Sequence, residues 1–270
     1  MAARAAAEII DFCYSISGGT RPAADTIMPK QRLDNLLVSR SLAENKSRAQ
    51  AAIMAGEVTV NGIVMTKAGN PVPEDADVQM KQKMPYVSRG GLKLAHALQA
   101  FGMDVKGLAC ADIGASTGGF TDCLLQHGAV RVYALDVGYG QLDYKLRQDN
   151  RVVVMEKVNA HYPFDLPEKV GLAVMDVSFI SVTMVIPNVL PHLVNEGELL
   201  VLFKPQFEAE RGDVGKGGVI RDPAVHARTI GDLIIWMNSS RLQLLNLAAS
   251  PILGAEGNRE FLVRLRPWKP

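Results

Sequence analysis

The chain has 270 residues and a formal net charge of +1, with 48% hydrophobic and 21% charged residues. This balance is typical of a folded globular protein and excludes an intrinsically disordered chain. Residues 28–106 carry 11 basic and 7 acidic residues, whereas residues 107–270 carry 16 and 18. A basic front part on a slightly acidic body indicates binding to a polyanion.

Three cysteines, Cys13, Cys110 and Cys123, are too few and too scattered for a disulfide scaffold or a zinc site, so we expect a reducing compartment. No run approaches the ~18 apolar residues of a membrane-spanning helix, because the longest candidate, Val170–Val194, contains Asp176 and two prolines. We therefore expect a cytoplasmic protein without a membrane partner. No metal site is predicted, because no ligand spacing connects the histidines His96, His127, His161, His192 and His226.

We expect residues 1–27 to form a disordered tail, because organised sequence begins only at Met28; the sequence leaves open whether the tail serves targeting. Two short amphipathic helices are predicted at 32–37 and 47–55. A β-hairpin is predicted at 58–64 around Asn61-Gly62, a pair that favours tight turns. A loop at 66–77 and a strand at 78–80 complete a small α+β domain, which we expect to span residues 28–86.

From residue 87 to 270, alternating strands and helices predict a second domain. The predicted strands are 108–113, 130–135, 152–155, 172–177, 198–203, 244–249 and 260–265, and the predicted helices are 91–101, 120–127, 141–148, 179–194 and 223–239. Apolar strands that alternate with helices indicate an α/β fold, a mostly parallel sheet covered by helices on both faces. Such sheets bind ligands at the carboxyl ends of their strands, so functional residues are expected there.

A glycine-rich turn, Asp112-Ile-Gly-Ala-Ser-Thr-Gly-Gly-Phe120, follows the first of these strands. Its spacing fits neither the dinucleotide-binding fingerprint nor the P-loop. The next strand ends at Asp136, whose carboxylate can accept hydrogen bonds from both hydroxyls of a ribose. A ligand with a ribose but no diphosphate, such as S-adenosylmethionine, suits this pattern. The alternative is an ordinary strand-to-helix turn in which Ser116 or Thr117 caps the helix.

Isolated charged residues mark three further strand ends. Asp176 follows an apolar strand and could instead cap the next helix; Glu260 begins the last strand and could instead face solvent. Lys204 emerges from Leu199–Phe203, where loss of water around its ammonium group would make it a candidate base. Lys93 lies on a helix, where lysines are usually solvated. Together these residues would place two lysines and two acids at one sheet edge.

Seven motifs, spread in order over about residues 30–266, resemble those of the TlyA (hemolysin A) rRNA methyltransferases. They are Val87-Ser-Arg-Gly-Gly-Leu-Lys-Leu, Asp112-Ile-Gly-Ala-Ser-Thr-Gly-Gly-Phe-Thr, Asp136-Val-Gly-Tyr-Gly-Gln-Leu, Asp176-Val-Ser-Phe-Ile-Ser, Lys204-Pro-Gln-Phe-Glu, Val214-Gly-Lys-Gly-Gly-Val and Gly257-Asn-Arg-Glu-Phe-Leu. Members join an RNA-binding domain of the ribosomal-protein-S-four type to an FtsJ-like, Rossmann-type methyltransferase domain. The resemblance implies S-adenosylmethionine-dependent 2′-O-methylation of ribose, of a cytidine, in ribosomal RNA or ribosomal subunits.

The resemblance also implies residue roles. The catalytic set would be Lys93, Asp176, Lys204 and Glu260. The chemistry of these side chains suits Lys204 as the base, the two acids as groups that orient the lysines, and Lys93 as the group that steers the hydroxyl or a phosphate. The implied cofactor-binding residues are Asp112, Gly114, Ser116, Thr117, Gly118, Gly119, Phe120, Asp136, Asn159 and Asp176. The expected RNA-binding residues are Arg32, Arg40, Lys46, Ser47, Arg48, Gln50 and Arg89, unless they only form a solvated surface.

Two other functions stay open from sequence. An RNA-binding or ribosome-assembly factor with an inert methyltransferase domain would show damage to the catalytic set, and none is seen. A membrane-lytic protein, as the family's historical name suggests, would need an apolar or amphipathic membrane helix. The glycine-rich residues 212–218 are predicted to form a mobile lip over the active site. The nucleotide, the ribosomal subunit and the oligomeric state are not specified by the sequence.

Overall fold

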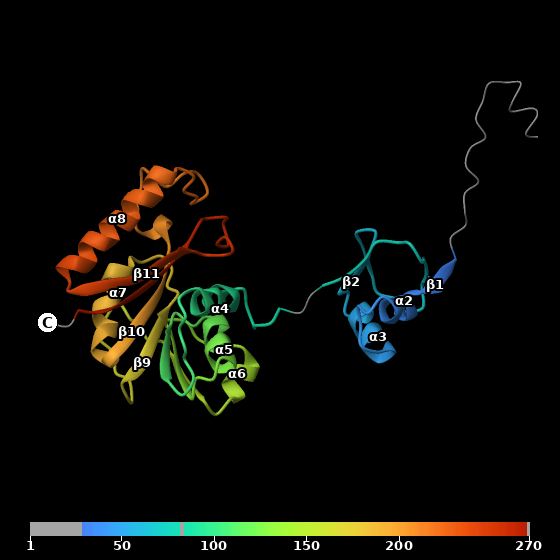
Figure 1. Ribbon diagram of the computed structural model, residues 1–270, viewed down its shortest axis with the longest axis horizontal. Helices are drawn as coiled ribbons and strands as arrows, with labels where there is room; N and C mark the ends of the chain where they lie inside the picture. Colours follow the sequence, from blue (N-terminus) through green and yellow to red (C-terminus); the bar gives the residue numbers. More distant parts are fainter. Residues whose placement is uncertain (1–28, 82–83, 269–270) are drawn as a thin grey trace, which may run out of the picture. The chain divides into compact units, whose positions relative to one another are not determined.

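The computed structural model describes residues 29–81 and 84–268, and it divides the chain into two units, Met1–Lys83 and Met84–Pro270 (Figure 1). We predicted a domain boundary after residue 86, slightly later in the chain than the boundary between these two units. Hydrogen bonds tie the start of the second unit to its helical layer: the amide of Val87 donates to Asp122 Oδ2, and Gln126 Nε2 donates to the carbonyl of Pro85. The predicted tail, residues 1–27, lies outside the described residues.

The first unit is a small α+β arrangement. Its elements are β1 (Lys30–Arg32), α2 (Leu33–Ser39), α3 (Lys46–Met54), β2 (Val58–Val60), β3 (Ile63–Met65), β4 (Pro71–Pro73) and β5 (Val78–Met80). An antiparallel sheet has the order β3-β2-β5, and β1 pairs with β4. The sequence missed β4, because two prolines flank Val72, and prolines are tolerated only in such edge positions. Both predicted helices and the Asn61-Gly62 hairpin are confirmed.

The second unit confirms the predicted alternation of strands and helices. Its elements are α4 (Gly90–Ala100), β6 (Ala109–Ile113), α5 (Gly119–Gln126), β7 (Arg131–Asp136), α6 (Tyr144–Gln148), β8 (Val152–Glu156), β9 (Val170–Met175), α7 (Val182–Val189), η1 (Leu190–His192), β10 (Leu193–Phe203), η2 (Pro205–Phe207), α8 (Pro223–Ser239), β11 (Leu242–Ala249) and β12 (Phe261–Pro267). The helix predicted at 179–194 is shorter, because Ser181 caps it through the amide of Thr183. Residues 193–197 extend β10 instead.

The seven-stranded sheet has the order β11-β12-β10-β9-β6-β7-β8, and the strands from β10 to β8 in this order run parallel. β12 is antiparallel to both of its neighbours. From β6 the chain first builds β7 and β8 on one side, and then β9 and β10 on the other. The strand order therefore reverses between β6 and β9, which opens a crevice at their carboxyl ends, the usual ligand site of such sheets.

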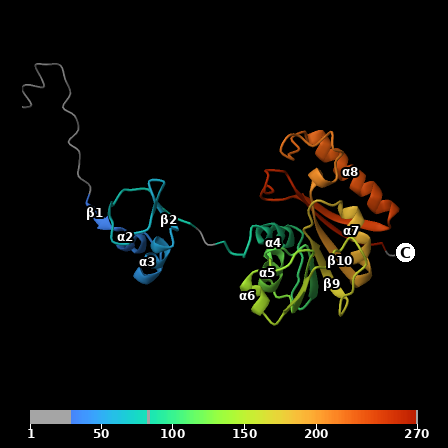
Figure 2. The same ribbon diagram turned by 180° about the vertical axis from the view of Figure 1, so that it is seen from behind.

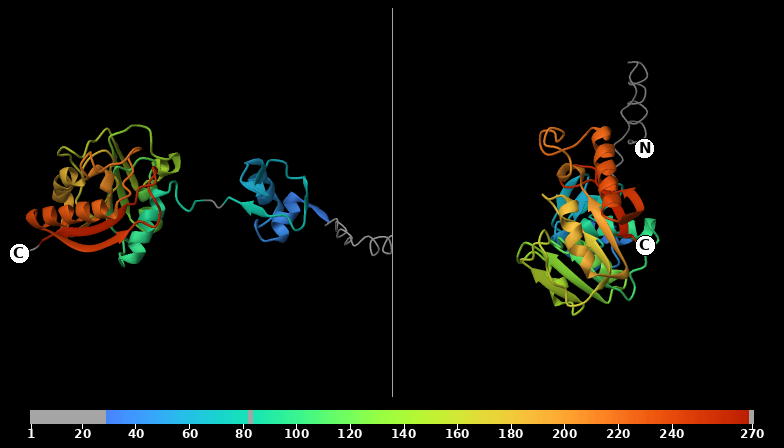
Figure 3. Two further views of the ribbon diagram at one scale, coloured as in Figure 1. Left: turned by 90° about the horizontal axis from the view of Figure 1, so that it is seen from above. Right: turned by 90° about the vertical axis from the view of Figure 1, so that its left-hand side faces the viewer.

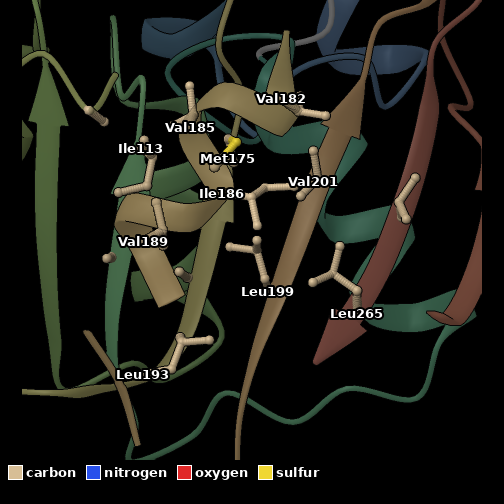
Figure 4. Close-up of a cluster of buried hydrophobic side chains, with 14 of the residues drawn as sticks. Ile113, Met175, Val182, Val185, Ile186, Val189, Leu193, Leu199, Val201 and Leu265 are labelled. Carbon is tan, nitrogen blue, oxygen red and sulfur yellow. The ribbon is translucent and has the colours of Figure 1, made fainter. Parts of the chain in front are cut away.

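Alternate strand residues pack against two helical layers. Ile113, Met175 and Val201 face α7 and join one buried cluster with it (Figure 4). Their chain neighbours, such as Val174 and Leu200, face α4, α5 and α6. Figures 1 and 2 show α4–α6 in green apart from α7 and α8, and Figure 3 shows α8 in orange beside the red strands β11 and β12. No helix within residues 29–81 and 84–268 is long and apolar enough to span a membrane.

Candidate functional site

Two glycines shape the turn from β6 to α5. Gly114 has φ +85°, and a Cβ there would lie 2.6 Å from the carbonyl oxygen of Asp176. Gly118 has φ +94°, and a Cβ there would lie 2.3 Å from Leu146 Cδ1. Both positions therefore require glycine. Gly118 directly precedes α5, which has no side-chain cap, so the alternative in which Ser116 or Thr117 caps the helix is wrong.

Asp112 lies beneath this turn, fully buried. Its Oδ2 accepts hydrogen bonds from the amide of Thr121 at 2.9 Å and from Thr121 Oγ1 at 2.6 Å. Burial raises the pKa of Asp112 to about 7; the nearby acids Asp176 and Asp136 act in the same direction, and the bonds from Thr121 oppose it. Asp112 lines neither of the two cavities described below. The carboxyl group therefore joins the strand before the turn to the helix after it. Its Oδ1 has no hydrogen-bond partner among the described residues.

We expect Asp112→Asn to remove a pH-dependent loss of stability. An acid with a raised pKa in the folded state stabilises the fold below its unfolded pKa, near 3.8, and this contribution is lost as the pH rises to about 7. The asparagine oxygen can still accept both bonds from Thr121 but carries no charge. In melting curves from pH 4 to 8, the wild type should lose stability relative to the variant over this interval. A constant difference between the two proteins would contradict the assignment.

A cavity of about 590 Å³ lies at the carboxyl ends of β6, β7 and β9. Asp136, at the end of β7, lines it, and its carboxylate accepts from the amides of Ser116 at 2.8 Å and Gly138 at 2.7 Å. Asn159 also lines it, with Oδ1 accepting from the amide of His161. The apolar part of the wall consists of Ile113, Leu135, Val137, Val158, Ala160, Val177, Phe179, Ile180 and Val185. A pocket with an apolar wall and polar groups such as Asp136 and Asn159 on one side suits a nucleoside-like ligand, which has an apolar base and a polar sugar.

A second cavity, of about 520 Å³, contains all four predicted catalytic residues. Lys93 Nζ lies 2.5 Å from Glu260 Oε2, and Lys204 Nζ lies 2.6 Å from Asp176 Oδ1. Lys93, Lys204 and Glu260 are each less than a tenth exposed. Each buried ammonium group therefore has its own carboxylate, as burial of charge requires.

The sheet register explains why residues so distant in sequence meet. Ile113 pairs with Met175, so Asp176 follows directly at the carboxyl end of β9. Phe203 pairs with Phe261 across antiparallel strands, so Lys204 and Glu260 emerge at the same end. Lys93 comes from the first turns of α4. The prediction that two lysines and two acids gather at one sheet edge is therefore confirmed as geometry.

The two cavities share Gly114, Ser116, Asp176, Ser178 and Phe179. Ser178 was not predicted, yet its Oγ accepts a hydrogen bond from Lys204 Nζ at 2.8 Å. Phe179 was not predicted either: it is 91% exposed, has φ +64° and lies with its ring centroid 5.0 Å from that of Phe207. A bulky residue with positive φ is unusual, and such residues cluster at functional sites. The sequence signal was the aromatic residue so soon after the end of an apolar strand.

The other predicted cofactor residues divide between the cavities. Ser116 and Gly114 line both, whereas Thr117, Gly119 and Phe120 line the cavity of about 520 Å³. Gly118 lines neither, because its position is filled by leucine side chains from the α6 region. Arg89 lines the cavity of the catalytic set, and its Nη2 donates to the carbonyl of Leu253.

In the first unit, a buried acid organises several predicted RNA-binding residues. Asp34 accepts two hydrogen bonds from Arg32, at 3.0 and 2.7 Å, and one from Gln50 at 2.9 Å, with Lys46 Nζ 3.9 Å away. The Arg32 guanidinium holds the pKa of Asp34 well below its usual range. Arg40 donates to the carbonyls of Glu74 and Ala76. By contrast, Ser47 and Arg48 are exposed, and their side chains form no hydrogen bond or ion pair within the described ranges.

Comparison with known proteins gives consistent matches for both units. Residues 86–267 match the family model "FtsJ-like methyltransferase", and residues 31–78 match "S4 domain". The chain is 46% identical to "Hemolysin A" of Brachyspira hyodysenteriae, covering 86% of this chain and 98% of that one. It is 41% identical to "16S/23S rRNA (cytidine-2'-O)-methyltransferase TlyA" of Mycobacterium tuberculosis, covering 88% and 90%. The solved structure titled "Putative hemolysin from Streptococcus thermophilus" aligns with a TM-score of 0.68 at 41% identity, covering 90% of each chain.

Proposed function

The chain belongs to the TlyA (hemolysin A) family of FtsJ-like methyltransferases with an S4 domain, and we propose that it methylates the 2′-hydroxyl of a cytidine ribose in ribosomal RNA. The observation that carries this proposal is the cavity in which two buried lysine–carboxylate pairs meet. That cavity adjoins a second one suited to a nucleoside, and the two share five residues. A donor and an acceptor of a methyl group could therefore meet at Asp176, Ser178 and Phe179.

The cavity of about 590 Å³ fits S-adenosylmethionine in size and in the chemistry of its wall. Asp136 is held by two backbone amides with carboxylate lone pairs left for a ribose diol, and the apolar side chains would enclose the adenine. Gly114 and Ser116 lie between this cavity and that of the catalytic set. When bound, S-adenosylmethionine supplies a methyl group on a positively charged sulfur.

Lys204 is the residue we assign to the ribose hydroxyl. A 2′-hydroxyl is a poor nucleophile until its proton is shared or removed, and positioned bases contribute about 10²–10⁴-fold to such steps. Lys204 Nζ is fixed between Asp176 Oδ1 and Ser178 Oγ, both at the border of the two cavities. In its neutral form Lys204 would accept the hydroxyl proton while the oxygen takes the methyl group. Asp176 then stabilises the ammonium group that forms.

Lys93 and Glu260 would position the nucleotide. Their ion pair lies in the same cavity as Lys204. Because the pair has no net charge, it can orient the nucleotide by hydrogen bonds without changing the net charge of the cavity. Lys93 would steer the hydroxyl or an adjacent phosphate. The exposed ring of Phe179, set against Phe207, would stack on the nucleobase, as aromatic side chains do on unpaired bases in RNA complexes.

The first unit would hold structured RNA through phosphate contacts, which position a substrate without reading much of its sequence. We expect Arg48→Glu to weaken binding to ribosomal RNA by about tenfold at low salt and to flatten the salt dependence of binding. Arg48 is the suitable residue, because changing Arg32 would also leave Asp34 buried without its main partner. Lys106→Glu, an equal charge change in the other unit, is the control. Unchanged binding by the Arg48 variant would remove this helix from the RNA contact.

The decisive experiment is methyl transfer from labelled S-adenosylmethionine to undermethylated ribosomal subunits, followed by mass spectrometry of the nucleosides. A 2′-O-methylcytidine product supports the proposal, and mapping it identifies the nucleotide and subunit. Binding of S-adenosylmethionine without transfer to either subunit would favour an RNA-binding factor that does not methylate. Failure to bind S-adenosylmethionine would refute the proposal entirely.

A further inference from the structure

Asn258 is the most deeply buried asparagine of the second unit, at 2% exposure, and the proposed chemistry gives it no role. It belongs to the loop between β11 and β12, two residues before Glu260. Its Nδ2 donates to the carbonyl of Gly218 at 2.8 Å, and its Oδ1 accepts from the amide of Ile220 at 3.0 Å. One buried amide group thus binds both a carbonyl and an amide of the same distant segment, which also fixes the orientation of the side chain.

The segment on the other side of this contact is glycine-rich. Within the described segment 212–220, the backbone hydrogen bonds join residues only three or four positions apart: the amide of Gly218 donates to the carbonyl of Gly215, and the amide of Gly215 donates to that of Val219. Gly217 and Gly218 have positive φ. Residues 215–218 are exposed, whereas Ile220 is buried at 3%. None of residues 212–218 lines either cavity. The segment, predicted as a lip, therefore does not line the cavities itself, and Asn258 links it to the loop that precedes Glu260.

The loop of Asn258 shapes the cavity of the catalytic set directly. Ala255, Glu256 and Glu260 line that cavity. The carbonyl of Asn258 accepts from the amide of Gly254, and a Cβ at Gly254 would lie 2.5 Å from Glu260 Oε1. The turn from Gly254 to Asn258 therefore packs against the carboxylate that pairs with Lys93. A shift of Asn258 would move this turn and with it the position of the carboxylate.

We propose that Asn258 is a positioning residue through which the glycine-rich segment 212–220 holds the carboxylate of Glu260 against Lys93. This inference rests on the proposed function, because it concerns the geometry of the same cavity. It gives the exposed segment a role although its residues 212–218 line neither cavity: its conformation sets whether the Lys93–Glu260 pair is in place. Contact of ribosomal RNA with residues 215–218 would then act on the catalytic set.

The test is a double-mutant cycle in single-turnover methyl transfer at saturating S-adenosylmethionine and RNA. Asn258→Asp keeps an acceptor for Ile220 but places a second oxygen against the carbonyl of Gly218. We expect the rate to fall about tenfold or more, with the Kd for S-adenosylmethionine and the KM for RNA within about threefold of wild type. In a Glu260→Gln background the same change should cost less than about threefold. Equal losses in both backgrounds would overturn the proposal, as would a wild-type rate.

A second pair of variants covers the case in which Asn258→Asp does not fold. Gly218→Ala and Gly212→Ala both add a methyl group in open space, but only Gly218 has positive φ. Gly218→Ala should slow the reaction in the same way as Asn258→Asp, and Gly212→Ala should not. Equal rates for the two alanine variants would count against the coupling. If wild-type protein binds S-adenosylmethionine but transfers no methyl group, the proposed function fails instead of this inference.

Discussion

Lys204→Ala should lower the rate of methyl transfer by about 10³-fold or more, with the Kd for S-adenosylmethionine close to that of the wild type. The loss has two parts: the proton acceptor disappears, which costs about 10²–10⁴-fold, and Asp176 keeps a negative charge without its partner. Cofactor affinity should survive, because Lys204 lines only the cavity of the catalytic set. The measurement is single-turnover transfer to undermethylated ribosomal subunits, together with calorimetric binding of S-adenosylmethionine.

Lys204→Arg separates a base from a fixed positive charge. Its guanidinium group can still pair with Asp176, but it stays protonated at every usable pH and cannot accept a proton. We therefore expect this variant to be nearly as inactive as Lys204→Ala. Lys169→Ala, at an exposed lysine that lines neither cavity, should have wild-type activity. Substantial activity in Lys204→Arg would show that Lys204 acts by charge alone.

Much of the second unit could be predicted because its signals are local. Apolar strands such as Leu199–Phe203 are recognisable by composition, and Asp176 and Lys204 stand out as charged residues at their ends. Parallel topology then brings those ends together, so the gathering of the four residues proposed as catalytic could be expected from sequence. Their grouping into one catalytic set came from the family resemblance, whereas the role of Lys204 as a candidate base came from its place at the end of an apolar strand.

What sequence could not predict is the partner that each buried polar side chain takes in the fold. Asp112 reads as a ligand-binding acid at the end of a strand, but its bonds to Thr121 direct it under the turn. Arg32 is predicted to contact RNA; its side chain is exposed, but its guanidinium group also donates hydrogen bonds to the buried Asp34 two residues away. The link from Asn258 to Gly218 spans 40 residues without any local signal. In each case a buried polar group forms hydrogen bonds that the folded structure provides, because leaving the group unpaired would cost stability.

Asp136→Ala should raise the Kd for S-adenosylmethionine about 100-fold, while the transfer rate at saturating cofactor falls much less. Hydrogen bonds to a charged acceptor contribute roughly 1.5–3 kcal/mol each, so the loss of two ribose contacts at the lower end of this range accounts for a change of about 100-fold. The effect on the rate should be small, because Asp136 does not line the cavity that holds the catalytic set. Calorimetry with S-adenosylmethionine measures the first quantity, and single-turnover transfer the second.

Two comparisons separate ribose binding from a general loosening of the turn, since Asp136 also accepts from the amides of Ser116 and Gly138. Asp143→Ala removes a nearby acid that only caps α6 through the amide of Lys145, so cofactor affinity should be unchanged. A 2′-deoxyribose analogue of S-adenosylmethionine should bind the wild type more weakly than the natural cofactor does. The Asp136→Ala variant should bind the analogue and the natural cofactor almost equally well. If both proteins discriminate against the analogue to the same degree, the ribose lies elsewhere, and Asp136 serves only to hold Ser116 at its positive φ.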